Sequence, residues 1–281
     1  MPDRITHSRA ARSAALITLL VLSALVSAAA PGPQPDAQTL VRATLDNHLP
    51  RTRISLESMT LQPPNGSPRT RKLLIIQRND AQASRTLLRF LEPARLRGTT
   101  LLTINQVDRQ GTDQWIHLPE LGDVRRIPAS GRGNRFAGSD FLFEDLSLED
   151  VTEQSLQFID VRTINDIEVA RIEAVPACDA MSSYARRVLW IELPRRVLLR
   201  IDFFRHNRRE PIKRYETLQM QEVDGRQLIT EAQMIDLESD HRTLLSTEAM
   251  DTDRSLPDSL FMPRALTDPR LDQWIPTRPR P

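Results

Sequence analysis

Cysteine and histidine are scarce in this chain, and their scarcity removes several kinds of chemistry. Cys178 is the only cysteine, so no disulfide can form within the chain, and no histidine is placed to activate it as a catalytic thiol. After residue 29 the histidines are His48, His117, His206 and His241, and none stands in a His-x₃-His spacing. No Gly-x-Ser-x-Gly motif occurs either. We therefore expect no metal site, no cofactor and no enzymatic activity.

Long apolar runs are missing after residue 29, where no segment approaches the ~20 apolar residues of a membrane-spanning helix. The N-terminus differs, because Arg4, Arg9 and Arg12 precede an apolar run over Ala14–Val26, and small residues follow it. This order is typical of a secretory signal peptide, which we predict over residues 1–29. The alternative, an uncleaved anchor, is disfavoured by the short run and the prolines after it. No cysteine lies near the cleavage site, so we expect an exported, soluble chain without a lipid anchor.

Charge of one sign is not in excess. Lysine and arginine number 38 and aspartate and glutamate number 37, which gives a formal net charge of +1 at pH 7. Three arginines and one aspartate of the predicted signal peptide contribute a net +2, so the mature chain carries about −1. Because the arginines alternate with carboxylates along candidate strands, we do not expect nucleic acid as a partner.

One amphipathic helix is predicted at the start of the mature chain. Leu40, Val41, Leu45 and Leu49 recur at helical spacing, Asp36 is a suitable N-cap, and a proline follows the run. After that proline the period of the apolar residues changes to two, which is typical of strands. We expect this helix to cover an apolar face of the sheet that follows.

The strands predicted from this alternation are joined by short turns, so sequential strands should pair antiparallel. In the clearest strand, Val197, Leu199, Ile201 and Phe203 share one face, and Asp224-Gly225 is a strong hairpin signal. The candidate strands cover residues 53–61, 71–78, 85–91, 99–106, 113–118, 156–162, 168–175, 187–193, 196–203, 213–221, 227–237 and 242–251.

About eleven strands with one leading helix and no βαβ rhythm predict a mainly β fold, a large antiparallel sheet that curls. Its concave face needs a cover, and the candidates are the leading helix and the irregular stretch 128–150. We predict a single domain over residues 36–268, with a short helical turn at 256–261, and a Pro-rich tail over residues 269–281 that is extended or disordered.

The irregular stretch combines aromatic residues with glycines. Phe136, Phe141, Leu142 and Phe143 surround Gly138 in a tract without strand or helix periodicity, where binding loops and lids are common. Core packing is the equal alternative. Gly131, Gly133 and Gly138 are candidate hinges for a moving cover.

Carboxylates stand in the same stretch. Asp140, Glu144 and Asp145 lie beside phenylalanines. A carboxyl group in an apolar environment can serve as a general acid, which makes catalysis one interpretation of this cluster. The favoured interpretation is structural: Ser139 or Asp140 caps a short helix, and the acids face water or pair with arginines. We expect those arginines to be Arg125 and Arg126, which would hold the cover shut or meet an anionic headgroup.

A succession of motifs then resembles a known family, the periplasmic outer membrane lipoprotein-sorting proteins of the LolA/LolB-like superfamily. The resemblance extends over most of the mature chain, and its Gly-Ser-Asp-Phe…Glu-Asp block is specific. The sequence departs from the pattern at Leu142, Phe143 and His117, where hydroxyl-bearing residues are common. The motifs are Gly98-Thr99, Trp115-Ile116-His117-Leu118-Pro119, Arg125-Arg126-Ile127, Phe136-x-Gly138-Ser139-Asp140-Phe141-x-Phe143-Glu144-Asp145, Leu256-Pro257-x-x-Leu260-Phe261 and Pro263-Arg264-x-Leu266.

The resemblance implies an incompletely closed antiparallel β-barrel with helices over its mouth and a hydrophobic cavity that receives acyl chains. It also implies an inner-membrane exporter of the resistance-nodulation-division type as a partner. We therefore expect a periplasmic carrier of a lipid or lipoprotein acyl chain, in transient contact with membranes. The residues we assign to the ligand or its cover are Leu40, Val41, Leu45, Leu49, Trp115, Phe136, Gly138, Phe141, Phe143, Leu199, Ile201 and Phe203.

Two other functions stay open from the sequence. The first is a non-enzymatic accessory subunit whose curved sheet packs against an exporter without lipid cargo. The second, less favoured, is a hydrolase that acts through Asp140 and Glu144.

Overall fold

The computed structural model describes residues 36–107, 111–177 and 181–277, with the side chains of 148–150 left out. The predicted signal peptide and Cys178 lie outside the described residues. None of the helices in these ranges is both long enough and apolar enough to cross a membrane.

The predicted leading helix is confirmed as α1, Ala37–His48. The Asp36 side chain caps it by accepting a hydrogen bond from the Thr39 N–H at 3.1 Å. The apolar stripe of α1 is buried, and this stripe is what the helical spacing predicted.

The strands form one antiparallel sheet of thirteen strands in the order β6-β5-β4-β3-β2-β1-β13-β12-β11-β10-β9-β8-β7. Two meanders thus meet where the first strand pairs with the last. The strands are β1 (Thr52–Gln62), β2 (Arg69–Asn79), β3 (Ala83–Glu92), β4 (Thr100–Gln106), β5 (Thr112–His117), β6 (Val124–Arg126), β7 (Ser155–Ile164), β8 (Ile167–Val175), β9 (Arg186–Glu192), β10 (Val197–Phe204), β11 (Lys213–Val223), β12 (Arg226–Asp236) and β13 (His241–Asp251).

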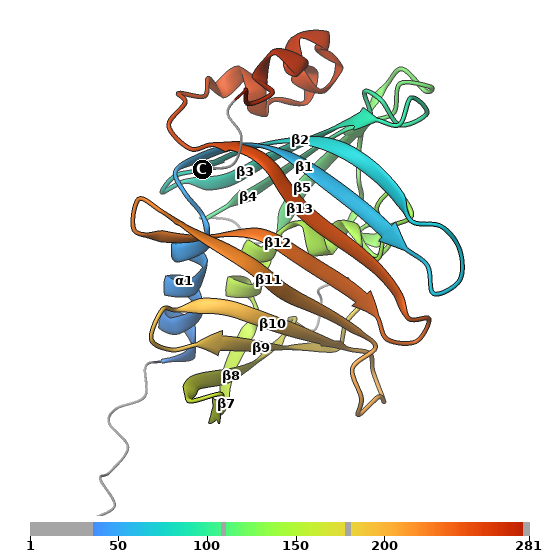
Figure 1. The fold of residues 1–281 in the computed structure, drawn as a ribbon. Helices are drawn as coiled ribbons and strands as arrows, with labels where there is room; N and C mark the ends of the chain where they lie inside the picture. The colour runs from blue at the N-terminus through green and yellow to red at the C-terminus, as the bar shows by residue number, and fades with distance from the viewer. Residues whose placement is uncertain (1–35, 108–110, 178–180, 278–281) are drawn as a thin grey trace, which may run out of the picture. The chain divides into compact units, whose positions relative to one another are not determined.

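The predicted mainly β class and incompletely closed barrel are confirmed. The sheet curls around α1, and β6 and β7 form its two edges (Figure 1). The strand count exceeds the expected eleven partly because β6 has three residues, too few for a period-two pattern to register. The hairpin at Asp224-Gly225 is confirmed, with φ of +51° and +73° as this turn type requires.

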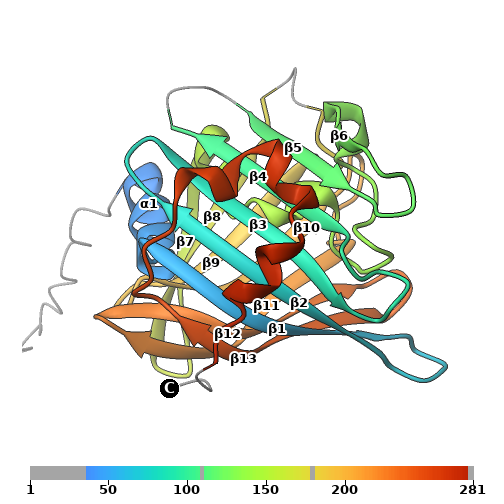
Figure 2. The same ribbon diagram turned by 90° about the horizontal axis from the view of Figure 1, so that it is seen from above.

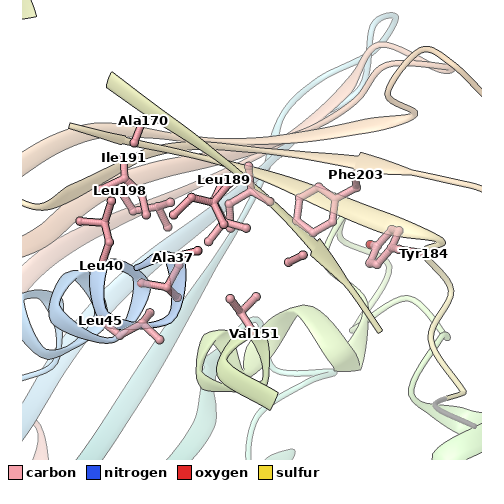
Figure 3. Packing of buried hydrophobic residues seen from close by; sticks show 14 of the residues in the cluster. Ala37, Leu40, Leu45, Val151, Ala170, Tyr184, Leu189, Ile191, Leu198 and Phe203 are labelled. Carbon is pink, nitrogen blue, oxygen red and sulfur yellow. The ribbon is translucent and has the colours of Figure 1, made fainter. Parts of the chain in front are cut away.

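The concave face is covered by α1 and by a segment that we call the cover segment, residues 129–154. It contains three short 3₁₀-helices, η1 (Ala129–Gly131), η2 (Phe143–Leu146) and η3 (Leu148–Glu153). Figure 3 shows Leu40 of α1 directed toward Ile191 and Leu198 of the sheet. Leu45 of α1 and Val151 of the cover segment belong to the same cluster. The expected cover of the concave face is therefore the one that forms.

The convex face carries its own apolar cluster, which we call the outer cluster. Figure 2 shows the C-terminal segment lying across the first meander. Its short helices are η4 (Asp258–Phe261), η5 (Pro263–Thr267) and η6 (Pro269–Trp274), and η4 confirms the predicted turn. Leu271 of η6 is 1% exposed in this cluster, so the expectation of an extended or disordered tail from residue 269 is wrong for Pro269–Trp274. Proline at the first position of a helix is compatible with helical backbone, and both η5 and η6 begin with it.

The predicted alternation in β10 is broken by one residue. The pairing with β9 shifts register between Leu198 and Arg200, which places Leu199 in a β-bulge. Leu198 instead packs in the cluster with α1, together with Ile201 and Phe203. A bulge inserts one extra residue, so the side chains before it point to the opposite face from the one that strict alternation predicts. Assigning Leu199 to the cavity face is therefore wrong.

Because Leu271 is buried in the outer cluster, we predict that shortening its side chain destabilises the fold. Leu271→Ala should lower the free energy of unfolding by about 2–5 kcal/mol, because it removes a fully buried leucine. Urea denaturation measures the effect. Met262→Ala, at a site that is 38% exposed, is the control and should cost under about 0.5 kcal/mol. Equal small losses in both variants would contradict the packing of η6.

Candidate binding cavity

A cavity of about 250 Å³ lies in the hollow of the sheet, between the end of α1 and the cover segment. Both meanders contribute to its walls, so the cavity exists only because β1 and β13 pair. Its apolar lining consists of Leu49, Ile75, Leu88, Leu101, Phe141, Leu146, Val151, Ile201, Phe203, Tyr215, Ile229, Ala232, Met234 and Leu245.

The structure brings part of the predicted site to this cavity. The predicted residues that line it are Leu49, Phe141, Glu144, Asp145, Ile201 and Phe203. Leu40, Val41 and Leu45 pack in the hydrophobic cluster around α1 and are not among the lining residues.

Two predicted aromatic residues of the cover segment, Phe136 and Phe143, pack in the core instead of lining the cavity. Phe136 is 1% exposed, and its ring centroid lies 5.5 Å from those of both Phe90 and Phe143. Gly138 follows at φ +71°, a conformation that favours glycine, and turns the chain back. Of the two interpretations from the sequence, core packing or a binding lid, core packing describes Phe136 and Phe143.

Trp115 lies on the other side of the sheet from the cavity. It packs against the outer cluster under the C-terminal segment. Neighbouring residues of a strand face opposite sides, and Gln114, the residue before it, points its side chain to the cover segment and donates to the Phe143 carbonyl at 2.9 Å. Trp115 is therefore not part of the cavity wall.

Polar side chains of β1 and β13 form one wall of the cavity. Arg53 donates to Glu57 at 2.9 Å and to the Thr247 hydroxyl at 3.0 Å, and Glu57 is 5% exposed. The Ser55 hydroxyl and Arg53 Nε are buried there without a hydrogen-bond partner among the described residues. Burial raises the pKa of Tyr215 to about 12, so this lining residue is a neutral phenol.

Glu144 forms a second polar wall, from the cover segment. It is 4% exposed, and its carboxylate accepts from the Ser182 hydroxyl at 2.8 Å and from the Ser183 N–H at 2.9 Å. Arg187, on β9, approaches it at 3.4 Å, with its guanidinium over the rings of Tyr184 and Phe203. These bonds hold η2 against the sheet.

Asp145, the next residue, also binds the cover segment to the sheet. Its Oδ2 accepts from the Tyr184 hydroxyl at 3.0 Å and from the Leu142 N–H at 2.8 Å, and Lys213 Nζ lies 3.4 Å away. Burial, followed by the negative charges of Asp145 and Glu144, raises the pKa of Tyr184 well above its usual value. Tyr184 therefore remains a hydrogen-bond donor.

Asp140 ties the cover segment to β13. Its carboxylate is fully buried and accepts from Thr243 at 2.7 Å and from Arg135 at 3.2 Å, and the His241 ring nitrogen lies 2.6 Å away. Its N–H donates to the Thr243 hydroxyl at 3.0 Å. Asp140 does not line the cavity, so the structure gives it an anchoring geometry.

The expected partners of these acids are wrong. Arg125 and Arg126 are exposed on β6, and Arg126 pairs with Asp113 of the adjacent strand. The acids pair instead with Arg135, Arg187 and Lys213, two of which stand on distant strands. The expected cap is also different, because η2 begins at Phe143 and the Leu142 N–H is satisfied by Asp145.

The sequence carried no local signal for several of these residues. Arg53, Glu57, Arg187 and Lys213 look like the polar positions of ordinary alternating strands. Arg53, Glu57 and Arg187 line the cavity, and Lys213 reaches Asp145 of the cover segment, because the sheet curls. Curling is a property of the whole sheet and not of one strand. Within the described ranges, no group of three or more His, Cys, Asp or Glu residues could hold a metal ion.

The end of α1 is fixed to the sheet by His48. Its Nδ1 donates to the Gln227 carbonyl at 2.6 Å, which leaves Nε2 to accept the Leu198 N–H at 2.8 Å. Desolvation lowers the pKa of this ring, although the bond to Gln227 opposes the shift. His48 is therefore the neutral imidazole that joins α1 to β10 and β12.

Comparison with protein families gave one match. Residues 82–268 match a family model whose description reads "Uncharacterized protein". Comparison with curated proteins gave no match.

Solved structures share the fold. A DUF1329 family protein from Desulfovibrio piger superposes with a TM-score of 0.75 at 23% identity, over 82% of this chain and 97% of that chain. A domain from Vibrio parahaemolyticus, described as a candidate outer membrane lipoprotein-sorting protein, gives 0.76 at 20% identity, over 83% and 98%. A LolA superfamily protein from Nitrosomonas europaea gives 0.65 at 18% identity, over 80% and 97%. The incompletely closed antiparallel barrel that the resemblance implied is thus the fold that these structures share with the chain.

The His48 ring predicts a pH dependence of stability. Its pKa is lower in the folded chain than the ~6.5 of an unfolded histidine, so the unfolded state binds the extra proton first. The free energy of unfolding should therefore be highest above pH 6.5 and fall as the pH drops from 7.5 to 5.5. Urea denaturation at each pH measures the slope.

The control variants isolate this ring. His48→Gln should reduce the slope, and His206→Gln, at an exposed site, should leave it unchanged. A slope that is the same in wild type and His48→Gln would contradict the role of His48.

Proposed function

The chain belongs to the protein family whose model matches residues 82–268, and from its cavity we propose that it is a periplasmic carrier that shields an acyl chain between membranes. The observation that carries the proposal is the apolar hollow inside an open antiparallel barrel, roofed by α1 and the cover segment. The fold of lipoprotein-sorting and LolA superfamily proteins supports it.

The size of the cavity supports a single hydrocarbon chain as the guest. Its volume of about 250 Å³ exceeds the ~150 Å³ of an engineered apolar cavity that binds benzene. Leucine, isoleucine and phenylalanine side chains supply most of the apolar wall. A chain that slides between these walls loses its contact with water.

The energetics favour exchange over capture. Burial is worth about 0.8 kcal/mol per CH₂, so a chain of roughly sixteen carbons represents about 13 kcal/mol of gross transfer free energy. Leaving a bilayer costs a similar amount, so the carrier only needs to match the membrane. Direction then comes from the donor and the acceptor, and an inner-membrane exporter is the partner that the family resemblance implies.

The roof has one regular part, the helix α1, and one irregular part, the cover segment, which contains only short 3₁₀-helices. The end of α1 is tied to the sheet by His48 and by Asn47, whose side chain donates to the Arg195 carbonyl at 2.8 Å. The cover segment is held by the bonds of Asp140, Glu144 and Asp145, each of which water can replace. We infer that the cover segment is the part that moves when cargo is exchanged.

Filling the cavity should abolish binding. Ala232 is 4% exposed and lines the hollow, so the ring of Ala232→Phe occupies the space of a guest. The dissociation constant for 11-(dansylamino)undecanoic acid, a fluorescent fatty acid, should rise at least about tenfold (about 1.4 kcal/mol). Fluorescence titration measures it, with the unfolding transition as the check of folding.

Leu199→Phe is the matched control, because it adds a similar ring at the bulge of β10, at a position that does not line the cavity. Its affinity should stay within about twofold of wild type. Unchanged binding by folded Ala232→Phe would contradict the placement of cargo in this cavity.

A further inference from the structure

A second cavity of about 350 Å³ lies beside the first, and we call it the vestibule. It is bounded by Gly133, Arg135 and Leu142 of the cover segment, by Ser183 and Tyr184 before β9, and by Lys213 at the start of β11. Its lining is rich in charged residues, whereas phenylalanines and aliphatic residues provide much of the first cavity's lining.

The two cavities share a wall that is one layer of side chains thick. Glu144 and Asp145 line the first cavity, and Ser183, Tyr184 and Lys213 line the vestibule. Direct bonds join the two sets, from the Ser183 N–H to Glu144 at 2.9 Å and from the Tyr184 hydroxyl to Asp145 at 3.0 Å. At these two hydrogen bonds, a lining residue of the cavity contacts a lining residue of the vestibule directly.

This wall opens without breaking the pairing of the strands. The cover segment and the turn at Ser182–Tyr184 contribute side chains and loops to it, and neither is part of the sheet. The two pieces touch closely at Gly133, where an added Cβ would lie 2.4 Å from Ser183 Oγ. Moving them apart breaks hydrogen bonds that water can replace.

One cation of the vestibule has its carboxylate partner outside the vestibule lining. Arg135 pairs with Asp236 at 2.6 Å and Arg205 pairs with Glu238 at 3.0 Å. Lys213 is 7% exposed, and its ammonium donates to the Tyr184 hydroxyl at 2.9 Å and pairs with Asp145, on the cavity side of the wall, at 3.4 Å. An anionic group in the vestibule would complement this ammonium.

We propose that the vestibule is the entrance to the cavity and holds the carboxylate or phosphate head of a single-chain amphiphile whose tail fills the cavity. This inference rests on the proposed carrier function and adds a route, a head site and a ligand class to it. The volume of the first cavity suits one chain, and Lys213 at the shared wall suits a compact anionic head.

A reversible crosslink across the wall tests the route. The Cβ built on Gly133 lies 3.8 Å from Ser183 Cβ, which is the usual Cβ separation of a disulfide. The variant Gly133→Cys/Ser183→Cys, with Cys178→Ser to leave a single thiol pair, should form this bond. Both positions line the vestibule and not the cavity, so the bond closes the wall without filling the hollow.

The measurement is the rate at which 11-(dansylamino)undecanoic acid loads and leaves the protein. Oxidised protein should load at least about tenfold more slowly than the same protein after dithiothreitol, and protein loaded before oxidation should retain the probe. Each single-cysteine variant should load at the rate of the reduced pair.

The outcomes separate the two claims. Equal rates in the oxidised and reduced forms overturn the entrance and leave the carrier function standing. A reduced protein that does not bind the probe at all overturns the carrier function and the inference with it.

The head site has its own test on the wild-type chain. The methyl ester of the same probe has an identical tail without the charge, and it should bind at least about tenfold more weakly than the acid. Lys213→Gln should remove this preference and Lys213→Arg should keep it. An ester that binds wild type as well as the acid overturns the anionic head, even where Lys213→Gln does not fold.

Competition then identifies the head. Palmitate and a single-chain lysophosphatidate each displace the probe if their head fits, so stronger displacement by palmitate identifies a carboxylate and by lysophosphatidate a phosphate. Displacement by neither overturns the anionic amphiphile as the ligand.

Discussion

Three buried carboxylates of the cover segment tie it to the concave face of the sheet, and the cavity depends on these ties. Asp140 is bound to β13, Glu144 to the turn before β9, and Asp145 to Tyr184 and Lys213. The sheet does not close on itself, because β6 and β7 remain its two edges, so the hollow is covered by segments outside the sheet. The hydrogen bonds of the cover segment can be replaced by hydrogen bonds to water when the segment moves. Apolar packing has no such replacement in water. Buried charges of this kind add little net stability when paired, but they are costly to leave unpaired, so they specify where the cover sits.

The sheet is covered on both faces, and only the cover of the concave face leaves a hollow. The C-terminal segment over the convex face packs through leucines and phenylalanine in the outer cluster, among them Leu260, Phe261 and Leu271. Its Asp258 and Asp272 also pair with Arg78 and Arg89 of the sheet. The cover segment over the concave face combines Phe136 and Phe141 with its carboxylates. The cover of the convex face therefore stabilises the first meander, while the cover segment leaves a hollow beneath it. In the proposed carrier, the convex side supplies stability and the concave side takes up the acyl chain.

Much of the fold could be predicted from local patterns. Alternation located the strands, the spacing of Leu40, Val41 and Leu45 located α1, and Asp224-Gly225 located a hairpin. The motif block around Asp140 indicated an incompletely closed antiparallel barrel, and solved structures share this fold with the chain.

The parts that were missed depend on geometry beyond a local pattern. The bulge at Leu199 shifts a period of two by one residue, and the sequence of β10 carries no mark of it. Arg125 and Arg126 looked like partners for the acids because they are near in sequence, but Arg187 and Lys213 come close only when the sheet curls. The prolines after residue 269 predict an extended tail, yet proline also begins helices, as η6 does.

The central claim is that a hydrocarbon chain occupies the hollow under the cover segment. The most direct measurement is native mass spectrometry, followed by lipid extraction, of the mature protein purified from its own cell envelope. The account predicts one bound single-chain amphiphile per protein molecule and a lipid-free Ala232→Phe variant prepared in the same way. A wild-type protein that carries no lipid, or a lipid that stays bound equally in the filled variant, would contradict it.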